Sequence, residues 1–141
     1  MRETPEVALL SIKPRFADAI LSGTKRVEFR RKRLADTVRH IVVYSTLPVG
    51  TVVGSCGVTG QMSASPDELW AAVGDVGGIS REEFDAYFEG TEQAVAILLE
   101  KPSRLDARRE VTLRELGATR PPQSFQYLNR SVRNTLAGTA A

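Results

Sequence analysis

The sequence predicts a single α+β domain in which a small, barrel-like mixed sheet is flanked by short helices. Three observations support this fold class. Short apolar segments typical of strands alternate with a few capped helix starts, glycine recurs every three residues within one strand-like segment, and the chain has the 141 residues of one ordinary domain. Hydrophobic residues make up 42% and charged residues 26% of the chain, which is typical of globular proteins rather than disordered ones.

The first third of the chain is predicted to begin with a strand and a helix. Residues 9–12 are a short apolar run that suits a buried strand. Pro14 suits the first turn of a helix, where its missing N–H costs nothing. Apolar side chains between Phe16 and Leu21 then recur at helical spacing. Gly23 follows at the position where helix ends use the left-handed conformation.

A second, basic strand is expected over residues 25–30, where polar and apolar side chains alternate with period two. Val27 and Phe29 are predicted to face the core. The opposite, polar face then carries Arg26, Glu28 and Arg30, subject to the register of the strand. Lys25 falls on the apolar side only at the end of the strand.

The middle of the chain is predicted to hold more strands and two helices. Residues 41–44 and the segment from Thr51 suit strands joined by a turn, and glycines at 54, 57 and 60 indicate bulges or close backbone approach. Ser65 suits a helix N-cap, and Ser80 with Glu83 suits a capping box. A further buried strand is expected over residues 93–99.

The C-terminal part is less regular. One helical turn is expected before Gly117, and the prolines at 121 and 122 favour an extended segment that leads to Phe125 and Tyr127. Residues 129–141 hold few apolar side chains, so we predict a domain over residues 1–128 and a flexible or partner-dependent tail after it.

Charge is unevenly distributed along the chain. The net charge is +2, but residues 1–40 carry +5, residues 41–100 carry −8 and residues 101–141 carry +5. If the last strands close a barrel with the first, one side of the molecule becomes basic and the other acidic, which suits an anionic ligand. The alternative is that the basic and acidic blocks pair with each other across the surface.

Several classes of protein are disfavoured by the sequence. No apolar run approaches the roughly 20 residues that span a membrane, and the N-terminus lacks the layout of a signal peptide, so we expect a cytoplasmic protein without a membrane partner. A single cysteine, Cys56, makes no internal disulfide, and with only His40 beside it no ordinary zinc site is assembled. No cofactor is expected, although a magnesium ion held by carboxylates stays open.

Several short motifs stand out along the chain: SIKP, SGTK and VEFRR near the start, YSTLPVGTVVG at 44–54 and PPQSFQYL at 121–128. Their combination is similar to the ASCH domain, a PUA-like family, over residues 7–128, and resembles the branch described as predicted regulators. The resemblance implies a PUA-like mixed β pseudo-barrel with a cleft. Its usual suspected ligand is a nucleic acid or a modified nucleoside.

The resemblance places the second strand on the floor of that cleft, so Lys25, Glu28 and Arg30 are predicted to face the ligand. Their alternative role is a surface ladder of paired charges, worth under about 1 kcal/mol per pair. Lys13, after the first strand, is a further candidate or else an ordinary solvated lysine. The basic run that contains Arg31 either follows a phosphate backbone or solubilises a loop.

Two more segments complete the predicted site. Tyr44, Ser45 and Thr46 match the family's strand and turn around the cleft, where hydroxyls read a base edge. Tyr44 is alternatively a core residue with its hydroxyl at the rim. The late segment of the family is matched by Gln123, Ser124 and Phe125. There the amide and hydroxyl bind a base edge while the aromatic ring stacks on its face, or else the segment closes the barrel with that ring in the core.

Our first functional hypothesis is a nucleic-acid-binding module, with RNA favoured over DNA, in which the basic strand holds phosphates and the cleft accepts one unstacked base or a nucleoside. The C-terminal tail is a candidate for a homodimer contact. A separate hypothesis is a protein-interaction module that uses the acidic face from Asp67 to Glu92.

The competing hypothesis is a hydrolase. Some ASCH proteins remove the acetyl group from N4-acetylcytidine with a lysine, a threonine three residues later and a distant glutamate. Lys25 matches the lysine, but Glu28 stands in place of the threonine, and residues 76–78 offer no counterpart of the glutamate. A rearranged site, in which Glu28 beside Lys25 acts as base toward a water on an amide or a phosphodiester, stays open. We favour the non-catalytic hypothesis.

Overall fold

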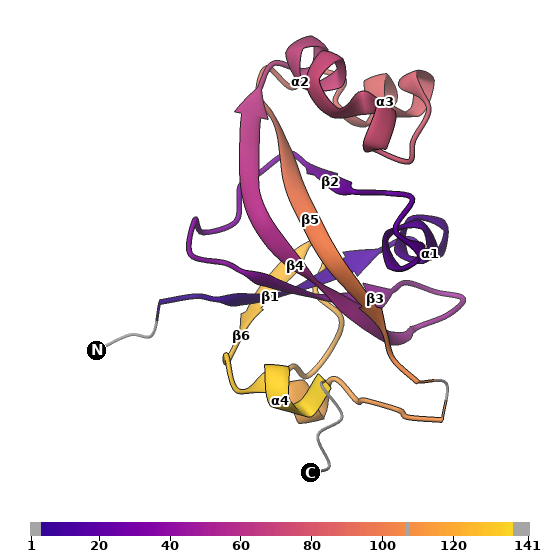
Figure 1. Cartoon of the computed structure of the whole chain (residues 1–141), viewed down its shortest axis with the longest axis vertical. Helices are drawn as coiled ribbons and strands as arrows, with labels where there is room; N and C mark the ends of the chain where they lie inside the picture. Colours follow the sequence, from indigo (N-terminus) through magenta and orange to yellow (C-terminus); the bar gives the residue numbers. More distant parts are fainter. Residues whose placement is uncertain (1–3, 107, 137–141) are drawn as a thin grey trace.

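The computed structural model describes residues 4–106 and 108–136, which form one bent, six-stranded sheet with short helices around it (Figure 1). The strands are β1 Val7–Ile12, β2 Val27–Arg30, β3 His40–Ser45, β4 Thr51–Ala64, β5 Ala94–Arg104 and β6 Phe125–Leu128. Their order in the sheet is β2-β5-β4-β3-β1-β6, with β1 and β3 parallel and the other neighbours antiparallel. This curled half-barrel confirms the predicted α+β fold class.

The helices lie around the ends of the sheet. They are α1 Pro14–Ser22, α2 Pro66–Val73, α3 Arg81–Tyr87 and α4 Val132–Leu136, with short 3-10 turns η1 Gly74–Val76 and η2 Arg114–Leu116. Figure 1 shows α2 and α3 together at one end of the long strands β4 and β5, whereas α4 lies at the opposite end of the molecule.

Helix α1 forms for the reasons that its sequence suggests. Pro14 occupies its first turn, and Ala17, Ile20 and Leu21 on one stripe are buried. Gly23 ends the helix with φ of 87°, in the left-handed region, and its N–H donates to the carbonyl of Ile20 at 3.1 Å. This sharp exit directs the chain from α1 straight into β2.

Both serines that were predicted to cap helices do so, but the capping box predicted at Ser80 is found at Ser65 instead. The Ser65 hydroxyl accepts from the Glu68 N–H, and the Glu68 carboxylate accepts from the Ser65 N–H, which completes a capping box. The Ser80 hydroxyl accepts from the Glu83 N–H at 3.1 Å. The Glu83 carboxylate pairs instead with Arg15 of α1 and with the Ser80 hydroxyl, so this carboxylate ties α3 to α1.

Glycines allow the long strand β4 to bend between its neighbours. The register between β4 and β5 shifts between Ser55 and Gly57 and again between Val58 and Gly60, which confirms the predicted bulges. At Gly54 the backbone of β5 comes so close that an added Cβ would lie 2.5 Å from the carbonyl oxygen of Ser103. The close approach lets the sheet curl around α1.

Three apolar clusters fill the fold. One lies under α1, between α1 and the inner face of the sheet, and includes the buried Cys56. A second joins the outer face of β1 and β3 to η2 and α4. The third is rich in aromatic rings and packs α2 and α3 against β2, with Phe29 and Phe84 ring centroids 4.9 Å apart. Trp70 is partly buried and packs against this cluster.

The C-terminal segment differs from its sequence-based description. Residues predicted as the start of a flexible tail include α4, whose Val132 is buried in the second cluster. The packed part of the chain therefore extends beyond Leu128, while residues 137–141 lie outside the described part. Among the described residues, no helix is long and apolar enough to cross a membrane.

We predict that Gly54→Ala destabilises the protein by about 1–3 kcal/mol, because the added methyl group overpacks the β4–β5 contact. Gly60→Ala in the same strand is the matched control. No atom lies within 4 Å of its added Cβ, so its stability should stay within about 0.5 kcal/mol of wild type. Urea denaturation measures both values, and equal destabilisation of the two variants would contradict the packing argument.

Candidate functional site

A cavity of about 510 Å³ opens where the half-barrel leaves a gap between its two edges. Its walls come from the end of β1, from α1, from β2, from the segment before β6 and from α3 with the loop before it. The lining residues are Ser11, Ile12, Lys13, Phe16, Lys25, Glu28, Phe29, Arg30, Arg31, Thr46, Ile79, Tyr87, Gln123 and Ser124. The edge strand β2 and the segment leading into the other edge strand, β6, thus face each other across this cavity.

Three charged side chains form a chain across the cavity floor. The Glu28 carboxylate accepts from Arg30 Nε at 3.0 Å on one side, and its other oxygen lies 3.9 Å from Lys25 Nζ. Glu28 is 7% exposed and Lys25 is 3% exposed. The three charges are paired, as the alternative role supposes, but Lys25 and Glu28 are buried rather than on the surface.

Lys25 is the most deeply buried of these charges. Its ammonium donates to the carbonyl of Gly77 and lies 5.1 Å from the ring centroids of both Phe16 and Phe29. Burial lowers the pKa of Lys25 below its ordinary value, an effect that the nearby Glu28 charge partly opposes. A lysine in such surroundings is more readily neutral than a solvated one, which makes it a candidate proton acceptor.

Two glycines bring the backbone of the α2–α3 connection against this lysine. A Cβ on Gly78, whose φ is 63°, would lie 2.9 Å from Lys25 Cβ. A Cβ on Gly77 would lie 2.5 Å from the Phe29 ring. The segment at 76–78, in which the sequence shows no catalytic glutamate, contributes a carbonyl acceptor and a close backbone wall instead.

Arg30 connects the two edges of the sheet. Its guanidinium donates to the Ser124 carbonyl at 3.3 Å, to the Ser124 hydroxyl at 3.1 Å and to the Ser11 carbonyl at 2.9 Å. The Ser11 hydroxyl donates in turn to the Pro122 carbonyl at 2.6 Å. Through these bonds Arg30 of β2 holds the end of β1 and the segment before β6 in place, while its Nε neutralises Glu28.

Arg31 lies at the cavity wall with an aromatic partner. Its guanidinium is 4.5 Å from the ring centroid of Tyr87 and also donates to the Tyr87 carbonyl. Burial raises the pKa of the Tyr87 hydroxyl, so this group stays protonated at neutral pH. Arg31 and the exposed Lys13 are thus the lining cations that lie nearest to solvent.

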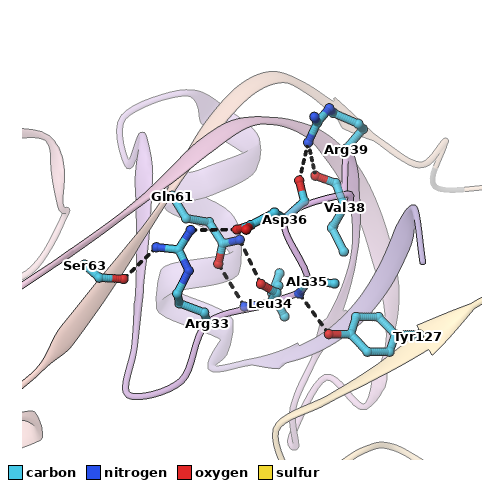
Figure 2. A network of polar contacts seen from close by, with 9 residues as sticks. All are labelled: Arg33, Leu34, Ala35, Asp36, Val38, Arg39, Gln61, Ser63 and Tyr127. Carbon is cyan, nitrogen blue, oxygen red and sulfur yellow. Dashed lines mark hydrogen bonds and ion pairs between the residues drawn. The ribbon is translucent and has the colours of Figure 1, made fainter. Parts of the chain in front are cut away.

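The loop between β2 and β3 is fixed by a polar network (Figure 2). The side-chain amide of Gln61 in β4 makes two hydrogen bonds with the backbone of Leu34. Its oxygen accepts from the Leu34 N–H at 2.8 Å, and its nitrogen donates to the Leu34 carbonyl at 3.0 Å. Arg33 donates to the Ser63 hydroxyl and pairs with Asp36. Figure 2 also shows the Ala35 N–H reaching the hydroxyl of Tyr127 in β6, at 2.9 Å. Members of the basic run 30–33 therefore point in different directions rather than forming one solvated cluster.

Most of the predicted site residues line the cavity. They are Lys13, Lys25, Glu28, Arg30, Arg31, Thr46, Gln123 and Ser124. Tyr44 packs in the second apolar cluster and Phe125 against the first, which matches the core alternatives for both rings. Ser45 is 2% exposed and is not among the lining residues. Whether any of these residues contacts a ligand stays a prediction.

Sequence reasoning missed part of the wall. Ser11, Phe16, Ile79 and Tyr87 line the cavity although none of them was a predicted site residue. The helical periodicity of the sequence marks Phe16 and Tyr87 as residues of an apolar face. It does not indicate that α1 and α3, which carry them, meet at the same cavity. Cys56 is buried, and burial raises the pKa of its thiol to about 12, so it is not an activated nucleophile.

Comparison with known families and proteins supports a specific assignment. The model of the ASCH domain matches residues 10–103. A protein of Zymomonas mobilis subsp. mobilis named ASCH domain-containing ribonuclease is 36% identical over 129 residues, which cover 87% of this chain and 84% of that protein. The large ribosomal subunit protein uL22 of Ureaplasma parvum serovar 3 is 30% identical over 127 residues, and this chain spans 40% of its length.

Solved structures agree with the sequence matches. The crystal structure of ASCH from Zymomonas mobilis superposes on this chain with a TM-score of 0.81 at 32% identity. The match covers 96% of both chains, so the same fold is present in a crystallised relative.

We predict that Arg30→Met destabilises the protein by about 3 kcal/mol, because it leaves the buried Glu28 carboxylate without its closest cation. In a Glu28→Gln background the same substitution should cost less, with a coupling of about 1–3 kcal/mol in a double-mutant cycle. Urea denaturation of the four chains measures this coupling. If it is absent, Arg30 stabilises the fold only through Ser11 and Ser124.

Proposed function

The chain belongs to the ASCH domain family, and from that premise we propose that it binds single-stranded RNA and takes one nucleotide into the cavity beside β2. The observation that carries this proposal is the makeup of the cavity wall. Lys13, Lys25, Arg30 and Arg31 line it, and one carboxylate, Glu28, faces them. A volume of about 510 Å³ lies in the range of small-ligand sites and suits a nucleotide.

The lining cations divide into two kinds. Lys25 and Arg30 hold the buried Glu28, and Arg30 also holds the backbone around Ser11 and Ser124. Lys13 and Arg31 are exposed and are therefore the better candidates for phosphate contacts, because they reach a polyanion without breaking the floor. Phosphate binding is thus assigned to the rim of the cavity and structural support to its floor.

The remaining wall suits a nucleobase. Phe16 and Tyr87 offer aromatic rings, and Gln123 and Ser124 offer amide and hydroxyl groups at the same opening. Single-stranded RNA is commonly read by stacking an unpaired base on aromatic rings and by hydrogen-bonding its edge. The ribonuclease name of the Zymomonas mobilis relative supports RNA over DNA as the polymer.

The same relative motivates a second candidate, RNA cleavage. In metal-independent cleavage the 2′-oxygen attacks the adjacent phosphorus while the proton of the 2′-hydroxyl passes to a base. The bond from phosphorus to the 5′-oxygen breaks, and this oxygen takes a proton from water, which leaves a 2′,3′-cyclic phosphate and a 5′-hydroxyl. Lys25, whose pKa is lowered by burial, is the candidate base in its neutral form, and Arg30 is placed to stabilise charge on the phosphoryl oxygens. Glu28 is the alternative base. Removal of acetate from N4-acetylcytidine is less favoured, because Glu28 replaces the threonine of that chemistry.

We predict that Lys13→Ala/Arg31→Ala weakens binding to a fluorescein-labelled single-stranded RNA in fluorescence anisotropy. Each lost phosphate contact makes the log–log salt dependence shallower by about 0.7, so the double variant should lose about 1.4. Arg114→Ala/Arg120→Ala removes the same charge from exposed positions outside the cavity lining and should keep the wild-type slope. Equal losses in both variants would contradict a specific site, and no RNA binding by the wild type would remove the proposal.

We predict that, if the protein cleaves RNA, the rate rises with pH and levels off below 10.5, the ordinary pKa of lysine, because deprotonation activates a base whose pKa is lowered. An oligonucleotide with a 2′-deoxy sugar before the scissile phosphate should be inert. Lys25→Met should abolish the reaction, and Glu28→Gln tests the alternative base. A rate that is independent of pH, or cleavage of the deoxy substrate, would rule out this chemistry, and binding without cleavage would leave the first proposal intact.

A further inference from the structure

The turn between β3 and β4 exposes apolar surface next to the cavity. Leu47 is 81% exposed and Val49 is 47% exposed, with Pro48 between them. Among the described residues the other large hydrophobic side chain classed as exposed is Tyr127 at 40%, and its hydroxyl accepts from the loop after β2. Single exposed apolar residues are ordinary. Here, however, two of three are concentrated in one turn.

This turn is held in a defined shape. The Thr46 carbonyl accepts from the N–H groups of both Val49 and Gly50, at 3.1 and 3.3 Å. Gly50 has φ of 65°, and the Leu47 Cδ2 lies 3.1 Å from the position that a Cβ on Gly50 would occupy. The Leu47 side chain therefore rests over a bare glycine backbone and is presented outward by a hydrogen-bonded turn.

The turn begins at the cavity wall. Thr46 lines the cavity together with Lys13 and Ile12, and its N–H donates to the Ile12 carbonyl at 2.9 Å. Leu47 is the next residue along the chain. A nucleotide chain held by the rim cation Lys13 would thus leave the cavity close to the apolar tip formed by Leu47, Pro48 and Val49.

We propose that this apolar tip contacts the base next to the one in the cavity, so that the substrate is a stretch of at least two nucleotides within a single strand rather than a free nucleoside. The inference rests on the proposed RNA binding. The reason is that a nucleic acid is a continuous chain. If the cations bind its phosphates and the cavity holds one nucleotide, the next base lies just outside the cavity. That base has lost a stacking neighbour, and an apolar surface replaces this contact. Leucine and proline side chains are known to contact nucleobases, as when they wedge between base steps of duplex DNA.

The test compares two ligands, an RNA tetranucleotide and a 5′-nucleoside monophosphate, on four chains. Covering the Leu47 side chain with a base removes enough apolar area that Leu47→Ser should weaken tetranucleotide binding about fivefold. The same variant should leave binding of the monophosphate unchanged. Leu47→Trp should tighten tetranucleotide binding through aromatic stacking. Leu47→Met, which keeps an apolar side chain of similar size, is the matched control and should behave as wild type.

The outcomes separate this inference from the proposed function. If the tetranucleotide binds wild type and Leu47→Ser equally well, the inference is wrong and RNA binding by the cavity stands. If neither ligand binds, the proposed function itself is wrong. Sedimentation velocity tests the alternative that the tip contacts a second copy of the chain. A wild-type dimer that Leu47→Ser dissociates would support this alternative and overturn the inference.

Discussion

The structure depends on one arginine that spans an unclosed barrel. The sheet ends in β2 on one side and β6 on the other, and Arg30 of β2 donates to the Ser11 carbonyl of β1 and to Ser124 just before β6. Backbone hydrogen bonds hold the remaining strands together, but at this gap a side chain does so. Because a guanidinium offers five N–H donors in a rigid plane, it satisfies several acceptors and still neutralises Glu28. The cavity is the space that remains around this bridge.

Because the ion pair of Arg30 and Glu28 is largely buried, the residues around it must satisfy its charges. A carboxylate that is 7% exposed needs partners, and Glu28 has Arg30 on one oxygen and Lys25 near the other. Lys25 in turn needs an acceptor and finds the Gly77 carbonyl, which approaches only because residues 77 and 78 lack side chains. The position of the α2–α3 connection therefore depends on the hydrogen bond from Lys25, a residue that also pairs with Glu28 of the edge strand β2. The aromatic side chains of Phe29, Phe84 and Phe88 also pack against the apolar residues of this connection.

Local features of the fold were predictable because their causes are local. Pro14, Gly23 and the serine caps act within one helical turn, and the glycines of β4 mark bulges by their spacing. The alternation of residues 25–30 also identified Glu28 and Arg30 as one face. The burial of this face was not predictable, because the groups that surround it come from distant parts of the chain. The carbonyl that accepts from Lys25 is 52 residues away, and the Ser124 hydroxyl that accepts from Arg30 is 94 residues away. Tyr44 and Phe125 show the converse, since a motif places them near the cleft but only packing decides which way each ring points.

The division between bridge and rim limits what the site can do. Arg30 cannot turn into the cavity without releasing Ser11, Ser124 and Glu28 together, so its charge is fixed in place. Fixed charges in a low-dielectric setting favour a transition state with localised negative charge, because they need no reorganisation. Exposed rim cations such as Lys13 suit the phosphates of a polyanion instead. The opening thus combines a floor of paired, fixed charges with a rim of exposed cations.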